Sequence, residues 1–458
     1  MPTRTSVYLF AERSAKLQLR TPKASHSVRT EPILSDVDSG RPAIGFVELL
    51  FLISAFLAPL ELKLLGSFTA YDFMIIALAF LISIGQDRFQ FFPLNFVPAI
   101  LLFLLFAIAS TLRATHPLES VTQILQFVII FFIQLPVILT LIRTPFLLRT
   151  SLLLFVCGTL IVTVWSYLFP QAQGAGRVMA FYSDSPNRLS YPTAYLLPFV
   201  LHYLFEHWRQ KRALLATVFA LPIFYLMVWA LAASASRSAA SGTLVGLMVF
   251  LIFRQGFRIN LKTPLRIVSA MMVIGLLGYL LYQTDYFPAT LRDRIARTLM
   301  LETSLVDDRR RLAVAGWRAF LDSPFLGVGL DNFRYVARQY LYSVTNQTPH
   351  NLWIQFLSQI GLIGTLMFFI IMIKWFMLML QAQKIVNPAL RDSHRELLWA
   401  FIAAMAAIMT IHMFLPIMIQ RQYWLLYGLG LAIALGAREP PAQIIRDTQR
   451  TPIGVECL

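Results

Sequence analysis

The chain has 458 residues, of which 57% are hydrophobic and only 14% are charged. Soluble domains carry charges on roughly a quarter of their residues, so this composition cannot cover a water-exposed surface and excludes a soluble enzyme. The formal net charge of +16 would indicate a nucleic-acid partner in a soluble protein. In a membrane protein it follows from basic cytoplasmic loops, so no nucleic-acid partner is expected.

Residues 1–43 are polar and basic and contain no apolar segment long enough for a signal peptide, which predicts a flexible cytoplasmic tail. Apolar runs that can cross a bilayer core of about 30 Å then recur. They predict an all-α polytopic membrane protein with a transmembrane domain over 44–437 and a cytoplasmic tail over 438–458. The twelve or so expected spans are 44–62, 68–86, 94–112, 120–142, 148–169, 191–207, 213–233, 238–254, 264–283, 351–380, 396–416 and 421–437.

Lys and Arg in the short loops predict the orientation, because such residues concentrate on the cytoplasmic side. The pattern places both chain ends in the cytoplasm. The basic residues that remain in the short external loops are Lys63, Arg113, Arg177, Arg188, Arg237 and Arg421. The five arginines among them lie beside helix ends, where they could surround a lipid phosphate or pyrophosphate. Taken singly, each could instead extend to the lipid headgroups.

A long external loop over 284–350 joins the ninth and tenth spans and carries nine arginines but no lysine. It is too long for the orientation rule to apply, so its charges need another explanation. Guanidinium binds phosphate oxygens bidentately, whereas the lysine ammonium offers only a point charge. Arginine without lysine therefore favours a phosphate-containing ligand.

Residues 307–333 of this loop read DDRRRLAVAGWRAFLDSPFLGVGLDNF. Acidic residues at the start, followed by apolar residues at helical spacing, predict an amphipathic helix on the external membrane surface. Pro324 ends this helix. Gly327 and Gly329 then permit a tight turn, where the backbone can approach a ligand or another helix. The apolar positions are Leu312, Ala315, Trp317, Ala319 and Phe320.

His350 and Asn351 stand at the entry of the tenth span. Asn351 is the expected N-cap of that helix, whose free N–H groups would attract an anion. His350 can accept a proton from a hydroxyl near neutral pH, unless it is only a boundary histidine with a structural partner. Gly361 and Gly364 are expected to serve close helix packing.

Two external turns carry weaker signals. SASRSAASG over 234–242 places Arg237 among small polar residues, whose hydroxyls can bind sugar or phosphate oxygens. FYSDSPNRLS over 181–190 leads into the sixth span, with Asn187 as its expected cap. Each could be only a turn and a cap. Glu61 and Asp72, which are isolated acids in the first external region, are expected to be interfacial caps.

In this order the motifs resemble the O-antigen ligase/O-antigen polymerase superfamily of bacterial inner-membrane proteins. The resemblance covers about 177–365, and its individual parts are loose while their order is more specific. The parts are Arg177 with Ser185-Pro186-Asn187, Ser236-Arg237-Ser238, Arg309 with Pro324, Gly327-Val328-Gly329, Asn332-Phe333, and His350-Asn351 with Gly361 and Gly364. The resemblance implies a GT-C-like helical fold in the bacterial inner membrane.

It also implies a periplasmic-face glycosyltransferase that needs no metal or other cofactor. Members use an undecaprenyl-pyrophosphate-linked glycan; ligases move it to lipid A core, and polymerases move it to another lipid-linked repeat unit. The implied partners are therefore that donor, a glycan or lipid A-core acceptor, and membrane lipid. The motifs do not separate ligase from polymerase.

The residue roles implied by the resemblance are pyrophosphate binding for Arg237 and Arg309 and catalysis for His350. Arg177 and Arg421 are added as further pyrophosphate binders from their positions beside helix ends. The run of three arginines blurs the register, so a neighbour of Arg309 could take its role; these neighbours are Arg310 and Arg311.

The expected chemistry is displacement at an anomeric carbon, with fixed guanidinium groups stabilising the pyrophosphate that leaves. The alternative is a lipid-linked glycan flippase or a polysaccharide export transporter. Such a protein would need ionisable residues deep in the bilayer or discontinuous helices in inverted halves. Charges here collect on one face instead, which favours the transferase.

Overall fold

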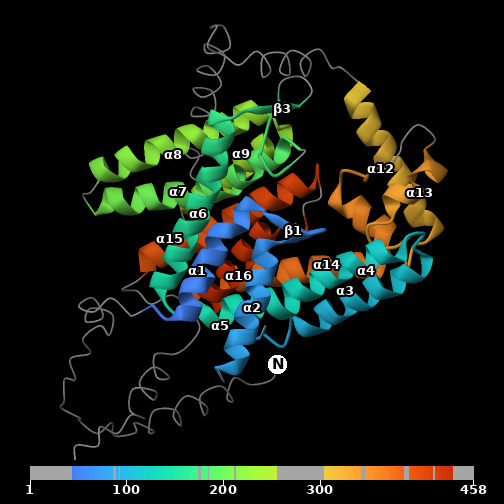
Figure 1. Ribbon diagram of the computed structural model, residues 1–458, viewed down its shortest axis with the longest axis horizontal. Coiled ribbons are helices and arrows are strands. Elements are labelled where there is room, and N and C mark those ends of the chain that lie inside the picture. The colour runs from blue at the N-terminus through green and yellow to red at the C-terminus, as the bar shows by residue number, and fades with distance from the viewer. Residues whose placement is uncertain are drawn as a thin grey trace, which may run out of the picture. The chain divides into compact units, whose positions relative to one another are not determined.

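The computed structural model describes most of the chain from residue 44 onward, and Figure 1 shows it as a helical bundle with two short β-hairpins. The tails over 1–43 and 438–458 and the ninth expected span, 264–283, lie outside the described residues. The residues described are 44–85, 89–91, 93–173, 177–183, 185–210, 213–254, 304–341, 347–385, 391–415 and 418–436.

The first third of the chain forms apolar helices joined by short turns. Capping begins them: the Glu48 side chain accepts from Gly45 N at 3.0 Å, and the Asp72 side chain accepts from Thr69 N at 2.7 Å. A two-stranded antiparallel hairpin occupies the residues before the second long helix, so the expected span 68–86 begins later, at Ala70. The elements are α1 (Phe46–Leu57), η2 (Ala58–Leu60), β1 (Lys63–Leu65), β2 (Phe68–Thr69), α2 (Ala70–Ile84), α3 (Val97–Ser110), η3 (Thr111–Arg113), α4 (Pro117–Ile129), η4 (Ile130–Gln134), α5 (Leu135–Leu141) and α6 (Pro145–Leu168).

The remaining elements complete the bundle and carry the motifs singled out in the sequence. The helix expected over 307–323 is present as α12 and ends before Pro324. The elements are β3 (Gln171–Gln173), β4 (Arg177–Met179), α7 (Asn187–Arg209), α8 (Ala213–Ser234), α9 (Arg237–Arg254), α12 (Ser304–Asp322), α13 (Phe333–Tyr340), α14 (Leu352–Ile385), α15 (Arg391–His412) and α16 (Arg421–Gly436).

Six helical segments of the described chain are long and apolar enough to cross a membrane. Three shorter apolar helices correspond to the first three expected spans. The coarse prediction of an all-α membrane protein is therefore confirmed, whereas twelve crossings stay a prediction. The six segments are Pro117–Leu141, Pro145–Leu168, Thr217–Ser234, Arg237–Arg254, Leu352–Lys384 and His394–His412.

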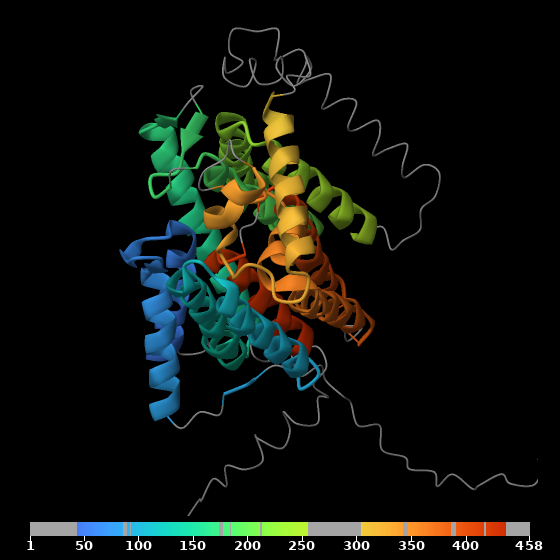
Figure 2. The same cartoon turned by 90° about the vertical axis from the view of Figure 1, so that its right-hand side faces the viewer.

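The core of the bundle surrounds α7 and α16, which are buried along most of their length. In both views α16, coloured red, lies among other helices (Figures 1 and 2). The first half of α7 is enclosed because it contacts α8, α9 and α15. This helix was expected as the sixth span, but it is too polar to be among the six apolar segments. Its buried position accounts for that, since protein rather than lipid covers it.

The apolar stripe of α12 packs against protein. Leu312, Ala315 and Ala319 are almost fully buried and form one cluster with Phe333 and Val336 of α13. The expectation that this stripe faces the external membrane surface is therefore wrong for these three positions. The stripe instead fixes α12 onto the following helix, because each short helix alone could not bury its apolar face.

α14 is broken at Gly361, whose φ of 70° and ψ of −175° lie outside the helical region. The turn after α12 docks into this break: Val328 N donates to Ser358 O at 2.9 Å, Gly329 N to Gln359 O at 3.0 Å, and Leu362 N to Pro324 O at 2.8 Å. Gly361 thus does more than permit close helix packing. The break at Gly361 leaves carbonyl groups of α14 without their helical hydrogen bonds, and backbone N–H groups of the docked turn donate to them instead.

Substituting Gly361 by Ala is expected to destabilise the fold by about 1–3 kcal/mol, because of its positive φ and its lack of space. A Cβ atom there would lie 2.2 Å from Phe325 O. The measurement is the thermal unfolding temperature in detergent. Gly436→Ala is the matched control, since its Cβ would meet no atom within 4 Å. Equal unfolding temperatures for the two variants would contradict the account of the break.

Candidate functional site

Arg177 is held in place by two elements that meet at one end of the bundle. Its Nε donates to Ser234 O at the end of α8 (2.7 Å), and its Nη2 donates to Asn187 Oδ1 at the start of α7 (2.9 Å). The guanidinium thus caps a helix C-terminus, where the carbonyl dipoles favour a cation. Asn187 was expected to cap α7, but its side chain makes no such bond and instead positions Arg177.

Arg237 begins α9 after a turn of only two residues from α8. Ala235 takes a left-handed conformation (φ 46°) in this turn, and Ser236 Oγ accepts from Ala239 N at 3.4 Å. Two of the small residues around Arg237, Ala235 and Ser236, therefore form the turn itself. Arg237 follows this turn as the first residue of α9, and its side chain is exposed.

Arg309 of α12 lies close enough to these two arginines for their charges to interact. Arg309 is exposed at the surface, but partial desolvation of its guanidinium and the positive charge of Arg237 lower its pKa. Burial, together with the charges of Arg309 and Arg237, likewise lowers the pKa of Arg177, against an opposing contribution from Tyr191. We call Arg177, Arg237 and Arg309 the arginine cluster. No ion pair identified within the described residues involves any of them.

His350 lies beside the arginine cluster. Burial first, and then the positive charge of Arg309, lower the pKa of His350 below its usual 6.5. Its backbone is left-handed (φ 51°), and its Nδ1 is buried with no hydrogen-bond partner among the described residues. Burial and the charge of Arg309 both favour the neutral imidazole, which is the form able to accept a proton. The predicted N-cap next to it is present, since Asn351 Oδ1 accepts from Trp353 N (3.0 Å) and Ile354 N (3.2 Å).

Arg421 and Arg310 occupy different positions from the cluster. Arg421 is buried and forms an internal ion pair: its Nε donates to both carboxylate oxygens of Asp72 at 2.9 Å, and its Nη2 donates to Ser67 O at 2.9 Å. Its hydrogen-bonding capacity is thus used within the fold. Asp72 is the helix cap that was expected and also the partner of this arginine. Arg310 is exposed on α12 next to Arg309.

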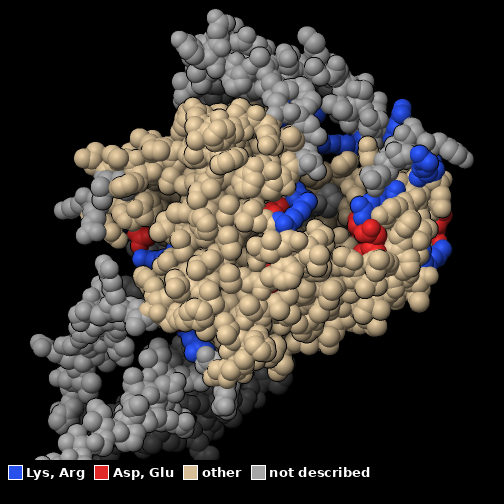
Figure 3. Space-filling view, in the orientation of Figure 1, with Lys and Arg blue, Asp and Glu red and all other residues tan. Residues whose placement is uncertain are grey.

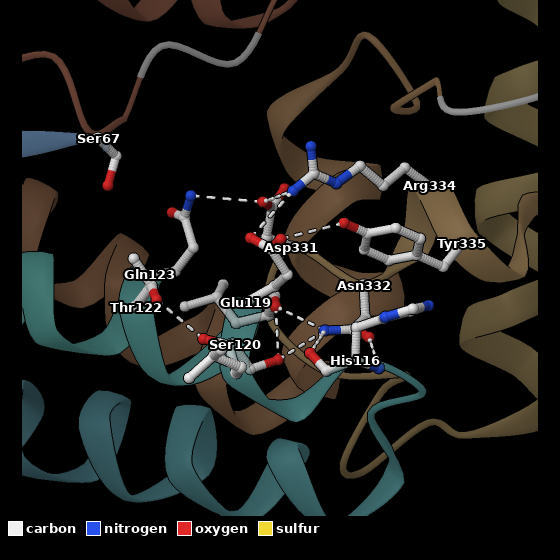
Figure 4. Close-up of polar contacts among 12 residues, drawn as sticks. Ser67, His116, Glu119, Ser120, Thr122, Gln123, Asp331, Asn332, Arg334 and Tyr335 are labelled. Atoms are coloured by element: carbon white, nitrogen blue, oxygen red, sulfur yellow. Dashed lines mark hydrogen bonds and ion pairs between the residues drawn. The ribbon is translucent and has the colours of Figure 1, made fainter. Parts of the chain in front are cut away.

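Asn332 anchors the loop between α12 and α13 to the start of α4, as Figure 4 shows. It is fully buried, and its Oδ1 accepts from His116 N at 2.7 Å. Its Nδ2 donates to Ser120 Oγ (2.8 Å), to His116 O (3.1 Å) and to Leu330 O (3.2 Å). The Asn332-Phe333 motif is therefore a structural clamp that fixes the position of the neighbouring Asp331.

Asp331 is held by charged and amide partners around this clamp (Figure 4). Its carboxylate lies 2.7 Å from Arg334 Nη2 and 3.5 Å from Gln123 Nε2, while Glu119 pairs with the same arginine at 3.3 Å. Burial raises the pKa of Asp331, and Arg334 opposes that rise. Like His350, Asp331 has a positive φ, of 58°.

A cavity of about 410 Å³ opens next to these residues. Figure 3 shows few charged side chains over most of this face; several lie near its centre and on its right side, and others lie separately at its left and lower left. Tyr191 and Thr348 line the cavity, and Thr348 precedes His350 by two residues. Its polar lining residues include Glu61, Gln123, Asp331, Gln355, Gln359 and Gln420.

The sequence reasoning missed this cavity. It treated Glu61 as an interfacial cap, whereas the Glu61 carboxylate is buried beside the cavity and bonded to Arg188 at 2.8 Å and Gln422 at 3.1 Å. One signal was available in the tenth span. Gln355 and Gln359 stand four residues apart, so they share one face of an otherwise apolar helix.

The fold and these side chains define a helical membrane protein with three guanidinium groups and one imidazole gathered at one end of its bundle. Residues 222–369 match the family model described as O-antigen ligase, which supports the predicted resemblance to the O-antigen ligase superfamily. This segment includes Arg237, Arg309 and His350. The family supports a ligase- or polymerase-type activity in general. No curated protein matches the chain.

Asn332→Ala is expected to lower the free energy of unfolding by about 2–4 kcal/mol, because it removes a buried hydrogen-bond network. The readouts are the unfolding temperature and the rate of tryptic cleavage after Arg334 and Arg338 of α13. Asn95→Ala is the control, since Asn95 is exposed and Lys374 contacts its backbone carbonyl rather than its side chain. Unchanged cleavage in Asn332→Ala would rule out the clamp.

Proposed function

We propose that the chain is a periplasmic-face glycosyltransferase of the bacterial inner membrane. It transfers or polymerises a glycan carried on undecaprenyl pyrophosphate, with both chain termini in the cytoplasm. The acceptor is lipid A core for a ligase, or another lipid-linked repeat unit for a polymerase. In this proposal guanidinium groups, without a metal ion, stabilise the charge of the leaving pyrophosphate.

The arginine cluster beside His350 is the observation that carries the proposal. Three cations near one another repel, so their arrangement favours a ligand with several negative charges. Guanidinium matches the oxygens of a phosphate bidentately. A neutral imidazole next to such a group supplies the proton acceptor that a hydroxyl nucleophile needs.

The proposed reaction is a displacement at the anomeric carbon of the donor sugar. The acceptor hydroxyl oxygen forms a bond to that carbon while the bond from carbon to the pyrophosphate oxygen breaks. The electron pair of the broken bond leaves with the pyrophosphate, and His350 takes the hydroxyl proton. Arg237 and Arg309 stabilise the added negative charge, and Arg177 fixes the position of the group.

Purified protein with a lipid-pyrophosphate glycan and two acceptors tests the proposal directly. Products that lengthen by repeat units indicate a polymerase, and transfer to lipid A core indicates a ligase. Absence of transfer to either acceptor would argue against the enzyme. A flippase, the alternative, would instead leave lipid-linked repeat units on the cytoplasmic side of a deletion strain.

Arg309→Lys is expected to lower kcat/KM by about 100-fold or more, because lysine keeps the charge but loses the bidentate contacts. Arg310→Lys is the matched control, because Arg310 is the next residue of the same helix but lies outside the arginine cluster. The measurement is the initial rate of transfer by purified variants. The reverse result, with Arg310→Lys impaired and Arg309→Lys active, would assign pyrophosphate binding to Arg310 instead of Arg309.

Transfer is expected to fail as the pH falls through the pKa of His350, because only the neutral imidazole accepts a proton. That pKa is lowered from 6.5, so the acid limb of kcat/KM should have its midpoint below pH 6.5. His350→Ala should lose about 10²–10⁴-fold in rate while still accumulating in the membrane. His207→Ala, which removes a half-buried histidine in the last turn of α7, is the control. Full activity in His350→Ala would remove the imidazole from the mechanism.

A further inference from the structure

We propose that the cavity beside the arginine cluster is a sugar-binding subsite, which holds one residue of the glycan through its hydroxyl groups. This inference rests on the proposed transferase function and specifies where the sugar of a substrate lies. The ligand class is set by chemistry. The cavity is lined by neutral amides, by carboxylates paired with arginines, by two of those arginines (Arg188 and Arg421) and by apolar side chains, and its volume of about 410 Å³ is in the range of small-molecule sites.

Two glutamines on α14 present unused hydrogen-bonding atoms at the cavity. Gln355 Oε1 and Gln359 Nε2 are buried, and neither has a hydrogen-bond partner within the described part of the chain. Gln359 is only 1% exposed. A buried polar atom without a partner is unfavourable, so such atoms usually meet a ligand or a water. One is an acceptor and the other a donor, and a sugar hydroxyl can satisfy both kinds.

The other end of the Gln359 amide is held by the fold. Gln359 Oε1 accepts from Asp331 N at 3.1 Å, and both side chains project from the same face of α14, one turn apart. The amide of Gln359 is therefore fixed with its oxygen toward the loop, which leaves its nitrogen as the free donor. The site is thus built in advance, as binding of a flexible glycan requires.

Two carboxylates extend this lining. Glu61 is paired with Arg188 at 2.8 Å, and Asp331 is paired with Arg334 at 2.7 Å. A carboxylate has about four acceptor positions, so these pairs leave lone pairs for hydroxyl donors. Because each carboxylate already has its own arginine, the cavity does not need a cationic ligand to balance it.

Apolar side chains complete the cavity. Phe127 and Phe356, both at most 2% exposed, lie against it together with Leu330. The C–H faces of a sugar ring are apolar, and aromatic side chains can cover them while amides bind the hydroxyls. The cavity also adjoins the proposed reaction centre, because Tyr191 and Thr348 line it. A sugar bound here would lie close to the imidazole and the arginine cluster.

Gln355→Leu tests the proposal, and Gln383→Leu is its matched control. Both glutamines are half-buried on α14 and carry a buried amide atom without a partner among the described residues, but only Gln355 lines the cavity. Binding is measured in detergent with the glycan-bearing lipid pyrophosphate and with sugar-free undecaprenyl pyrophosphate. Transfer rates are measured over a range of acceptor concentrations. Gln359→Leu serves as a second cavity variant.

Gln355→Leu is expected to leave binding of the sugar-free lipid unchanged, which also shows that it folds. If the bound sugar belongs to the donor, the variant loses about tenfold in affinity for the glycan-bearing lipid. If the sugar belongs to the acceptor, KM for the acceptor rises about tenfold instead. Either result supports the subsite, and Gln383→Leu should change neither quantity.

The proposal is overturned if both cavity variants keep wild-type affinity for the glycan-bearing lipid and wild-type KM for the acceptor. If the wild-type protein transfers glycan in the same experiment, the proposed enzymatic function stands and only the sugar-binding subsite is rejected. Failure of the wild-type protein to bind either lipid or to transfer glycan is a different result. It would remove the proposed function and the subsite together.

Discussion

Repulsion among the guanidinium groups of the arginine cluster is the constraint on which the rest of the site depends. The charge of Arg237 acts on Arg309, and both act on Arg177. Like charges in partly desolvated surroundings raise the free energy of the folded protein unless dipoles or an anion compensate. Arg177 receives dipoles, from the Ser234 carbonyl and the Asn187 amide. A pyrophosphate would relieve the remaining repulsion, so the feature that destabilises the free protein would also give affinity for the leaving group.

The backbone around this cluster is strained, and the surrounding contacts hold the strain in place. The non-glycine residues with positive φ in the described segments are Glu61, Ala235, Asp331 and His350, and all four lie at the cavity or next to the cluster. Such conformations cost about 1–3 kcal/mol each and persist where neighbours over-determine them. Asp331 N donates a hydrogen bond to Gln359 Oε1, and the side chain of the next residue, Asn332, anchors the same loop to His116. The break at Gly361 allows the same loop to reach α14, so one irregular region positions both Asp331 and the two cavity glutamines.

The sequence predicted what depends on local pattern and missed what depends on long-range pairing. Apolar run length placed most described helices, and Pro324 marked the end of α12 correctly, because both signals are contained in neighbouring residues. The order of motifs placed Arg177, Arg237, Arg309 and His350 at one end of the bundle. The pairing of Arg421 with Asp72, 349 positions away, has no local signal. The cavity has none either, since its lining comes from α4, α7, α14, the start of α16 and several loops that are far apart in the chain.

Some arginines of the described residues form ion pairs with carboxylates and those of the arginine cluster do not. This difference gives the site its positive electrostatic potential. Arg188 is held by Glu61, Arg334 by Asp331 and Glu119, and Arg421 by Asp72. These pairs neutralise the acids nearest the cavity, so the carboxylates are not free to fold over the arginine cluster and compete with a phosphate. A buried ion pair of this kind contributes little net stability, because desolvation offsets the Coulomb attraction. Its effect is instead to keep carboxylate charge away from the arginine cluster. The positive potential of the cluster therefore depends on side chains that do not themselves bind the proposed pyrophosphate.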